Sequence, residues 1–224
     1  MYVLRENILR GLWSKPAYIS AVIEQELAKP PSKRLKWLFW TDADLVLMNP
    51  NIPLDIFLPP EPEFKHIDVL VTKDENGLNN GVFAVRVNAN AARLFSAVVS
   101  WKIYRPEVRL KYNDQSALEN LLSHDLWVNK TAWIPQRWIN AYPVKMLNAT
   151  TLTNKKPQKH NFRAGDLLIH FAGNKDLKRD ERMAYWMNIA EKHLPQYEVP
   201  LDQTSFKEEI GRFWDSKKNK GAKA

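Results

Sequence analysis

The feature that most constrains this chain is a short apolar run that ends in two carboxylates. The run from Trp37 to Trp40 has no polar residue, which is typical of a strand buried on both faces of a parallel or mixed sheet. Asp42 and Asp44 follow almost at once. Side chains on alternate residues of an extended segment point the same way, so both carboxylates can converge on one hard cation. Because ligands of open α/β sheets bind at this end of the strands, the pattern predicts a metal site there.

Further apolar runs predict more strands, and the segments between them carry helical patterns. Strands are predicted at residues 68–72, 81–87 and 167–169, the last of which places His170 at its end. Residues 76–80 contain asparagine and glycine, so they predict a turn. This alternation predicts an α/β fold with a mixed sheet flanked by helices. Apolar residues recur at helical spacing in residues 4–27, where Pro16 predicts a kink or a helix pair, and in residues 89–101, 114–122, 178–194 and 204–217.

Length and composition predict one folded domain. The chain has 224 residues, of which 45% are hydrophobic, enough for a single substantial core. We expect residues 1–200 to form that domain and residues 201–224 to form a C-terminal helix with a basic, disordered tail. The absence of cysteine excludes disulfides and thiolate metal sites. The net charge of +8 is compatible with anionic substrates such as nucleotide diphosphates, and four of the positive charges lie in residues 217–223.

His170 and Lys175 can complete the site that the two aspartates begin. Neutral imidazole is a good third ligand for a transition-type cation such as Mn²⁺. Lys175 follows five residues later, across a glycine turn, and can reach a phosphate as a point charge. Taken alone, His170 reads better as a strand-end histidine and Lys175 as a solvated lysine. The argument for a site therefore rests on their combination with Asp42 and Asp44.

Two polar clusters elsewhere are compatible with sugar contacts. Asn79 and Asn80 precede Gly81, and a glycine there would let the backbone approach a ligand while the amides bind hydroxyl groups. An ordinary tight turn explains the same residues. Asp114 and Gln115 begin a predicted helix, where Asn113 or Asp114 would contribute about 1 kcal/mol as an N-cap. Capping and sugar contact are compatible.

A phosphatase offers a rival interpretation of the two aspartates. An apolar strand followed by Asp42-x-Asp44 resembles the nucleophile motif of haloacid-dehalogenase-type phosphatases, with Asp42 as nucleophile and Asp44 as general acid. That motif requires a later Gly-Asp with another aspartate a few residues on. Gly165-Asp166 is followed by apolar residues and His170 instead, which weakens this alternative. A bare Asp-x-Asp is also common in turns with solvated carboxylates.

Taken in order, five segments of the chain resemble family 34 glycosyltransferases, which include fungal galactosyl- and mannosyltransferases and plant xyloglucan xylosyltransferases. Five motifs in the family's order are more specific than any one of them. The segments are Trp37 to Asp44 with Met48-Asn49-Pro50, Leu78 to Phe83, Asn113 to Leu118, Ile134 to Asn140, and Gly165 to Gly173.

The resemblance implies a GT-A-like fold and a retaining transfer of a hexose, galactose or mannose, from a UDP- or GDP-sugar to a protein-linked or polysaccharide glycan acceptor. It implies no nucleic-acid partner, and a type II membrane anchor and Golgi lumenal location for the full-length protein. The first βα unit of the family's fold and the anchor are expected to be missing from this chain. By the same resemblance, the cation ligands are Asp42, Asp44 and His170, the donor contacts are Asp42, Ala43, Asn79, Asn80, Gly81, Gly173 and Lys175, and the catalytic residues beside the anomeric carbon are Asp114 and Gln115.

The chemistry of Gln115 favours one retaining mechanism. An amide is a poor nucleophile, so a front-face substitution, in which the departing phosphate helps to deprotonate the acceptor, fits better than a covalent enzyme intermediate. Three alternatives to an active transferase stay open from the sequence. They are the phosphatase, a non-catalytic nucleotide-sugar-binding remnant, and a nucleic-acid-binding module that only the net charge supports.

Overall fold

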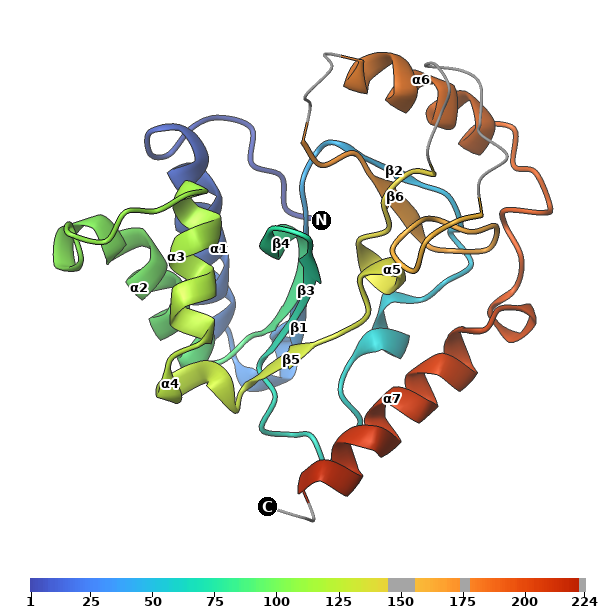
Figure 1. Cartoon of the computed structure of the whole chain (residues 1–224). Coiled ribbons are helices and arrows are strands. Elements are labelled where there is room, and N and C mark those ends of the chain that lie inside the picture. The colour runs from blue at the N-terminus through green and yellow to red at the C-terminus, as the bar shows by residue number, and fades with distance from the viewer. Residues whose placement is uncertain (145–155, 174–177, 222–224) are drawn as a thin grey trace. The chain divides into compact units, whose positions relative to one another are not determined.

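The structure of the chain, a computed structural model, describes residues 1–144, 156–173 and 178–221 (Figure 1). These residues form two compact units, each built from two stretches of the chain. The first unit comprises Met1–Trp40 and His66–Trp133, and the second comprises Thr41–Lys65 and Ile134–Ala224. Each unit is described by itself below. The prediction that residues 1–200 form one glycosyltransferase domain stays a prediction.

A mixed four-stranded sheet organises the first unit. Its strands β1 (Trp37–Thr41), β3 (Val69–Asp74), β4 (Gly77–Arg86) and β5 (Thr131–Trp133) lie in the order β1-β4-β3-β5. Strand β3 pairs antiparallel with β4 and parallel with β5, so the predicted mixed sheet is confirmed. The expectation that β1 is buried on both faces is wrong, because β1 is an edge strand and its residues 37–40 are only half-buried.

The turn between β3 and β4 is shorter than the sequence predicts. Asp74 pairs with Gly77, and the Asp74 carboxylate accepts a hydrogen bond from the backbone of Asn76 at 2.6 Å. Gly77 has a φ of +104°, which glycine adopts at low cost. The chain therefore reverses over two residues. Asn79, Asn80 and Gly81 consequently lie within strand β4 and not in the predicted turn at residues 76–80.

Helices α1 (Ser14–Leu27), α2 (Ala89–Tyr104), α3 (Asn113–Leu122) and α4 (Asp125–Val128) complete the first unit (Figure 1). The predicted kink at Pro16 is wrong: Pro16 lies in the first turn of α1, where its missing N–H costs no helical hydrogen bond. Helix α2 is capped by Asn88, whose side chain accepts from the backbone of Ala91. Buried side chains of the helices and sheet form one core, in which Phe83 stacks on Phe95 with ring centroids 6.0 Å apart.

The described residues of the second unit form a two-stranded sheet and three α-helices. Strand β2 (Leu45–Leu47) pairs antiparallel with β6 (Leu168–His170), and Leu45 lies opposite His170. Beside this pair, Val46, Ile169 and Phe171 form a core cluster with Trp186 of helix α6. The helices are α5 (Gln136–Ile139), α6 (Arg179–Ala190) and α7 (Phe206–Gly221), and short 3-10 helices of the chain are Gly11–Trp13, Pro31–Lys33, Leu54–Phe57 and Leu201–Gln203. Helix α7 therefore extends beyond residue 217, where the sequence predicts its end.

An ionic cluster around Arg137, together with the indole N–H of Trp138, holds α7 in the second unit. Arg137 of α5 contacts the carboxylate of Asp166 and donates to both carboxylate oxygens of Glu209 on α7 at 2.5 Å. The indole N–H of Trp138 donates to the same Glu209 at 3.1 Å. Arg137 and Asp166 are almost completely buried, at 6% and 2% exposed. The cluster therefore places two charges of opposite sign in the interior, where each depends on the other.

Gly165 is a position where only glycine fits. Its φ is +89°, and a Cβ built there would lie 2.8 Å from Cγ2 of Val199. We expect Gly165→Ala to lower the free energy of unfolding by about 1–3 kcal/mol, since the added methyl group must displace Val199 and adopt an unfavourable backbone conformation. Urea unfolding measures this loss. Gly211→Ala in α7 is the matched control, because beyond its own helix backbone and chain neighbours no atom lies within 4 Å of its Cβ position, and alanine is the better helix former. Equal stability of the two variants would contradict the prediction.

Among the described residues, none of the helices is long and apolar enough to cross a bilayer.

Candidate functional site

The pairing of β2 with β6 brings Asp44 next to His170. Asp44 immediately precedes β2, and its backbone carbonyl accepts a hydrogen bond from the N–H of Phe171 at 2.8 Å. Its carboxylate oxygen Oδ1 lies 3.4 Å from Nε2 of His170. Asp42 joins this pair, so that one ligand atom from each of the three side chains lies within 4.8 Å of the others. The three residues that the sequence predicts as cation ligands are thus close together in one unit.

Asn140 fixes the orientation of the His170 ring. Oδ1 of Asn140 lies 2.6 Å from Nδ1 of His170, and both side chains are buried. An amide oxygen can only accept, so Nδ1 carries the hydrogen. In neutral imidazole the lone pair then lies on Nε2, where a cation could bind, whereas the protonated ring donates from Nε2 to Asp44. Asn140 had no predicted role, although it ends the family-like segment from Ile134 to Asn140, because its contact with a histidine 30 residues away is a tertiary one.

Arg179 is the second residue at this site that the sequence analysis missed. Its Nη1 donates to Oδ2 of Asp44 at 3.0 Å. Burial alone would raise the pKa of Asp44, but its contact with His170 and the charge of Arg179 hold that pKa below the ordinary value of 3.8. Asp44 is therefore ionised at neutral pH. Arg179 lies in the first turn of α6, a place in which the sequence pattern indicated only an amphipathic helix.

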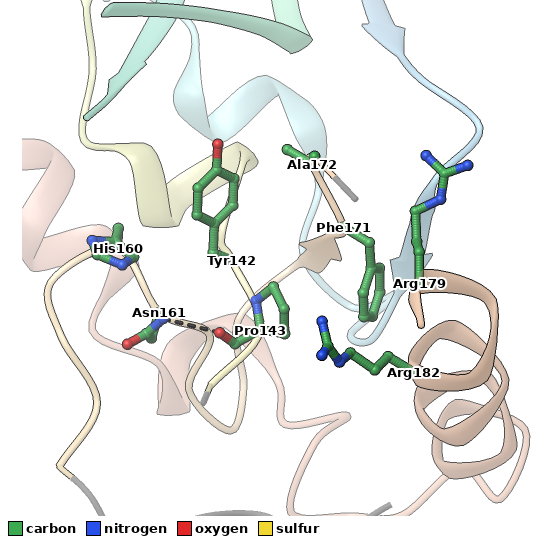
Figure 2. A pocket seen from close by; sticks show the side chains of 9 residues that line it. Tyr142, Pro143, His160, Asn161, Phe171, Ala172, Arg179 and Arg182 are labelled. Carbon is green, nitrogen blue, oxygen red and sulfur yellow. Dashed lines mark hydrogen bonds between the residues drawn. The ribbon is translucent and has the colours of Figure 1, made fainter. Parts of the chain in front are cut away.

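A cavity of about 190 Å³ adjoins Asp44 through Arg179. Gly173, a predicted donor contact, is one of the residues that line it, whereas Lys175 lies outside the described residues. Figure 2 shows Arg179 and Arg182 rising from the start of α6 and Tyr142, His160 and Asn161 lying across the cavity from them. The lining is Tyr142, Pro143, His160, Asn161, Phe171, Ala172, Gly173, Arg179 and Arg182.

The remaining predicted site residues form a hydrogen-bonded network in the first unit. Nδ2 of Asn80 donates to Oδ2 of Asp114 at 2.9 Å, and the backbone N–H of Asn80 donates to Oε1 of Gln115 at 3.3 Å. Lys15 donates to the backbone oxygen and to Oδ1 of Asn80, both at 3.2 Å. The side-chain Oδ1 of Asn79 instead accepts a hydrogen bond from the backbone N–H of Gly81, in its own strand, at 3.0 Å. Lys15 had no predicted role, because its segment showed only a helical pattern.

The prediction that Asn113 or Asp114 caps α3 is wrong. The N-cap residue is Tyr112, whose side chain makes no capping hydrogen bond. Asn113 has a φ of +45°, and Asp114 lies inside the first turn, where it is buried against Asn80. The carboxylate of Asp114 therefore belongs to the network with Asn80 and not to a helix cap.

The profile of the galactosyl transferase GMA12/MNN10 family matches residues 59–181, more than half of the chain. The chain belongs to this family. It is the glycosyltransferase family 34 that the five sequence motifs resemble. The GMA12/MNN10 match includes Asn79, Asp114 and His170, whereas Asp42 and Asp44 precede residue 59. The grouping of the two aspartates with His170 therefore rests on the geometry of the second unit.

Two proteins of Schizosaccharomyces pombe are relatives of this GMA12/MNN10 family chain. The probable alpha-1,2-galactosyltransferase gmh1 is 26% identical over 199 residues, covering 74% of this chain and 54% of gmh1. The probable alpha-1,2-galactosyltransferase gmh2 is 27% identical over 197 residues, covering 73% of this chain and 51% of gmh2. The chain thus spans about half the length of these relatives.

A solved structure confirms the fold predicted for this GMA12/MNN10 family chain. A glycosyltransferase involved in the glycosylation of the major capsid of PBCV-1 matches it with a TM-score of 0.51 and 18% identity, over 80% of each chain. Together with the mixed sheet and its helices, this likeness bears out the α/β, GT-A-like fold class.

Proposed function

We propose that the chain carries the site of a metal-dependent, retaining glycosyltransferase. It would transfer a hexose, galactose or mannose, from a UDP- or GDP-sugar to a protein-linked or polysaccharide glycan acceptor. One observation carries the proposal: Asp42, Asp44 and His170 each offer a ligand atom within 4.8 Å of the others. The names of the relatives gmh1 and gmh2 favour galactose over mannose. Family membership favours a transferase over the phosphatase alternative.

The three side chains suit a divalent cation of the Mn²⁺ type. Carboxylates suit hard cations. Imidazole nitrogen binds transition metal ions such as Mn²⁺ more readily than it binds Mg²⁺. Asn140 leaves the lone pair of His170 on Nε2, as such a ligand requires. When bound, the cation supplies positive charge that stabilises the departing nucleotide diphosphate. Asp42, Asp44 and His170 would hold it, and Ala43, exposed between the aspartates, lets the donor approach.

We propose that the network of the first unit provides the catalytic and sugar-binding groups. Asn79, Asn80 and Gly81 would contact the donor sugar, and Asn79 also accepts a hydrogen bond from the backbone of Gly81. Asp114 and Gln115 would lie at the anomeric carbon, with Lys15 and Asn80 holding them in place through the hydrogen bonds of the network. Because the Gln115 amide is a poor nucleophile, front-face substitution is the mechanism we favour.

The test is calorimetric titration of UDP and of GDP into metal-free protein, with and without Mn²⁺, repeated on Asp44→Ala and His170→Ala. The expected result is Mn²⁺-dependent binding of one nucleotide, lost in both variants. Binding that persists in both variants would contradict the site. Nucleotide binding without measurable sugar transfer would support the non-catalytic remnant instead, and phosphate release abolished by Asp42→Ala would support the phosphatase.

Loss of the Asn140 side-chain oxygen is expected to weaken cation binding. Removal of the partner that orients a metal-binding histidine typically lowers metal affinity by about 10–100-fold, and we expect this loss for Asn140→Leu. Mn²⁺ binding is measured by electron paramagnetic resonance of the free ion. Asn140→Asp is the matched variant, because its carboxylate still accepts from Nδ1 and should retain binding. Equal losses in both variants would show that Asn140 has a general packing role only.

Location in the Golgi lumen and a type II membrane anchor in the full-length protein also stay proposals. Both proposals follow from the family resemblance. The chain itself spans only about half the length of the relatives gmh1 and gmh2.

A further inference from the structure

The cavity beside Asp44 has a lining suited to anions. Its charged residues are Arg179 and Arg182, and His160, Asn161 and Tyr142 add polar groups. None of the nine described residues that line it is acidic. A concave lining with two guanidinium groups attracts negative charge even though Asp44 offsets part of the charge of Arg179, and guanidinium groups match phosphate oxygens in geometry. The cavity therefore has the chemistry of a phosphate-binding site.

The two arginines are in different situations. Arg179 donates to Asp44 at 3.0 Å, its side chain is 37% exposed, and it also lines the cavity, so it contacts one proposed cation ligand and the cavity. Its Nε makes no hydrogen bond to any of the described residues but lies 3.8 Å from Oδ1 of the exposed Asp180. Arg182 lies one helical turn further along α6, and Figure 2 shows its side chain extending from the helix into the cavity. One arginine is thus attached to the metal site and the other belongs to the cavity.

A bound cation changes the electrostatics of Arg179. Oδ1 of Asp44 faces His170 and Oδ2 accepts from Arg179, so a cation bound at Oδ1 would share the carboxylate charge with the guanidinium group, and the two cations would repel each other at close range. An anion in the cavity would offer Arg179 a new partner near its present position. A ligand that reaches both the cation and the cavity needs two linked anionic groups, as a diphosphate has.

We propose that Arg179 and Arg182 bind the diphosphate of the donor in this cavity, and that Arg179 exchanges Asp44 for a phosphate oxygen when the cation binds. The inference rests on the proposed function, because it takes the donor to be a nucleotide diphosphate. It adds two binding residues and a coupling between the cation and the donor. Arg179 keeps Asp44 neutralised before the cation arrives and is released to the diphosphate afterwards.

Two titrations test the two halves of this proposal separately. Inorganic pyrophosphate is titrated into metal-free protein, and Mn²⁺ alone is titrated into protein without pyrophosphate. The variants are Arg179→Gln, Arg182→Gln, Asp44→Asn and the double variant Asp44→Asn with Arg179→Gln. Both arginines are only partly buried, so these changes spare the core. Arg212→Gln on α7, where the arginine is 67% exposed, is the control for lost positive charge.

The two arginine variants are expected to change the affinities for different ligands: Arg182→Gln that for pyrophosphate, and Arg179→Gln that for Mn²⁺. Arg182→Gln should lower pyrophosphate affinity by about 10-fold or more and leave Mn²⁺ affinity unchanged, since it removes one charge-assisted contact. Arg179→Gln should raise Mn²⁺ affinity by about 1.4- to 5-fold, since a partly exposed ion pair no longer competes for Asp44. Asp44→Asn should raise metal-free pyrophosphate affinity, because it frees Arg179, and the double variant should lose that gain.

Other outcomes overturn the proposal. Pyrophosphate affinity that is unchanged in both arginine variants, or lowered equally by Arg212→Gln, would show that the cavity is not its site. A pyrophosphate affinity that Asp44→Asn does not raise would refute the exchange. Failure of Mn²⁺ alone to bind the unmodified chain would instead refute the metal site of the proposed function, while the metal-free titrations would still decide whether the cavity binds diphosphate.

Discussion

Asp44→Asn is expected to remove measurable binding of Mn²⁺ to this chain. Asp44 is one of the three proposed cation ligands. Its carboxylate lies 3.4 Å from Nε2 of His170, and Asp42 offers the third ligand atom. Asparagine keeps the shape of the side chain but loses the negative charge that a hard cation requires. The loss should exceed the roughly 10–100-fold that removal of an orienting partner causes.

Electron paramagnetic resonance of free Mn²⁺ measures the effect on metal-free protein. Asp202→Asn is the matched control, because Asp202 is exposed in the same unit and belongs to no acidic group at the site. The folded state of each variant is verified by circular dichroism. Mn²⁺ affinity within a few-fold of the unmodified chain would contradict the proposal that Asp44 is a ligand.

Arg137→Met is expected to lower the free energy of unfolding by about 3–5 kcal/mol at pH 7.5, the cost of breaking a buried ion pair by removing one partner. Methionine fills much of the same volume without charge. Asp166 would then keep a buried carboxylate without its counter-ion, and Glu209 on α7 would lose two hydrogen bonds. The weaker attachment of α7 should therefore accompany the loss in stability.

The cost of Arg137→Met should depend on pH in a defined direction. Burial raises the pKa of Asp166 to about 6, in spite of the charge of Arg137. Because this folded-state pKa is above the ordinary value of 3.8, the contribution of Asp166 to stability is complete below pH 3.8 and is lost as pH rises to about 6. Without Arg137 that pKa should rise further. The destabilisation should consequently be smaller at pH 5, where the carboxyl is largely protonated.

Urea unfolding at pH 7.5 and pH 5 tests both statements. The double variant with Asp166→Asn should recover much of the loss, because no buried charge is left unpaired. Arg212→Met is the control, since its pair with Glu208 is exposed and is expected to contribute less than about 1 kcal/mol. Similar losses for Arg137 and Arg212 would contradict the account given for the cluster.

The sequence predicted those parts of the fold and site that depend on local pattern. Alternating or continuous apolar runs located β1, β3, β4 and β6, and the helical patterns located α2, α3 and α6 within a few residues. The helix predicted from residue 4 was too long, because α1 begins only at Ser14. The Asp-x-Asp spacing and a histidine at the end of a strand identified the three residues that β2 and β6 bring together. These features are encoded in neighbouring residues, and so they are readable without tertiary structure.

Features that depend on pairing between distant segments were not predictable in this way. Asn140 orients His170 across 30 residues, and Arg179 reaches Asp44 across 135 residues. Lys15 joins the network at Asn80 across 65 residues. The assignment of Asn79 to Gly81 to a turn failed because the two-residue reversal at Gly77 extends β4 through these residues. Local sequence patterns therefore predict where helices and strands lie, whereas the hydrogen-bond partners of the site residues depend on tertiary contacts.

The discontinuity of the two units limits how the protein can be dissected. The chain passes from one unit to the other after Trp40, after Lys65 and after Trp133. A single proteolytic cut therefore cannot separate the two units, because any fragment that contains one whole unit also carries a segment of the other. A fragment that begins at Ile134 has His170 and Asn140 but lacks β2 and both aspartates, so His170 would have no strand to pair with and no carboxylates beside it. Independent production of the second unit requires both of its segments to be joined or supplied together.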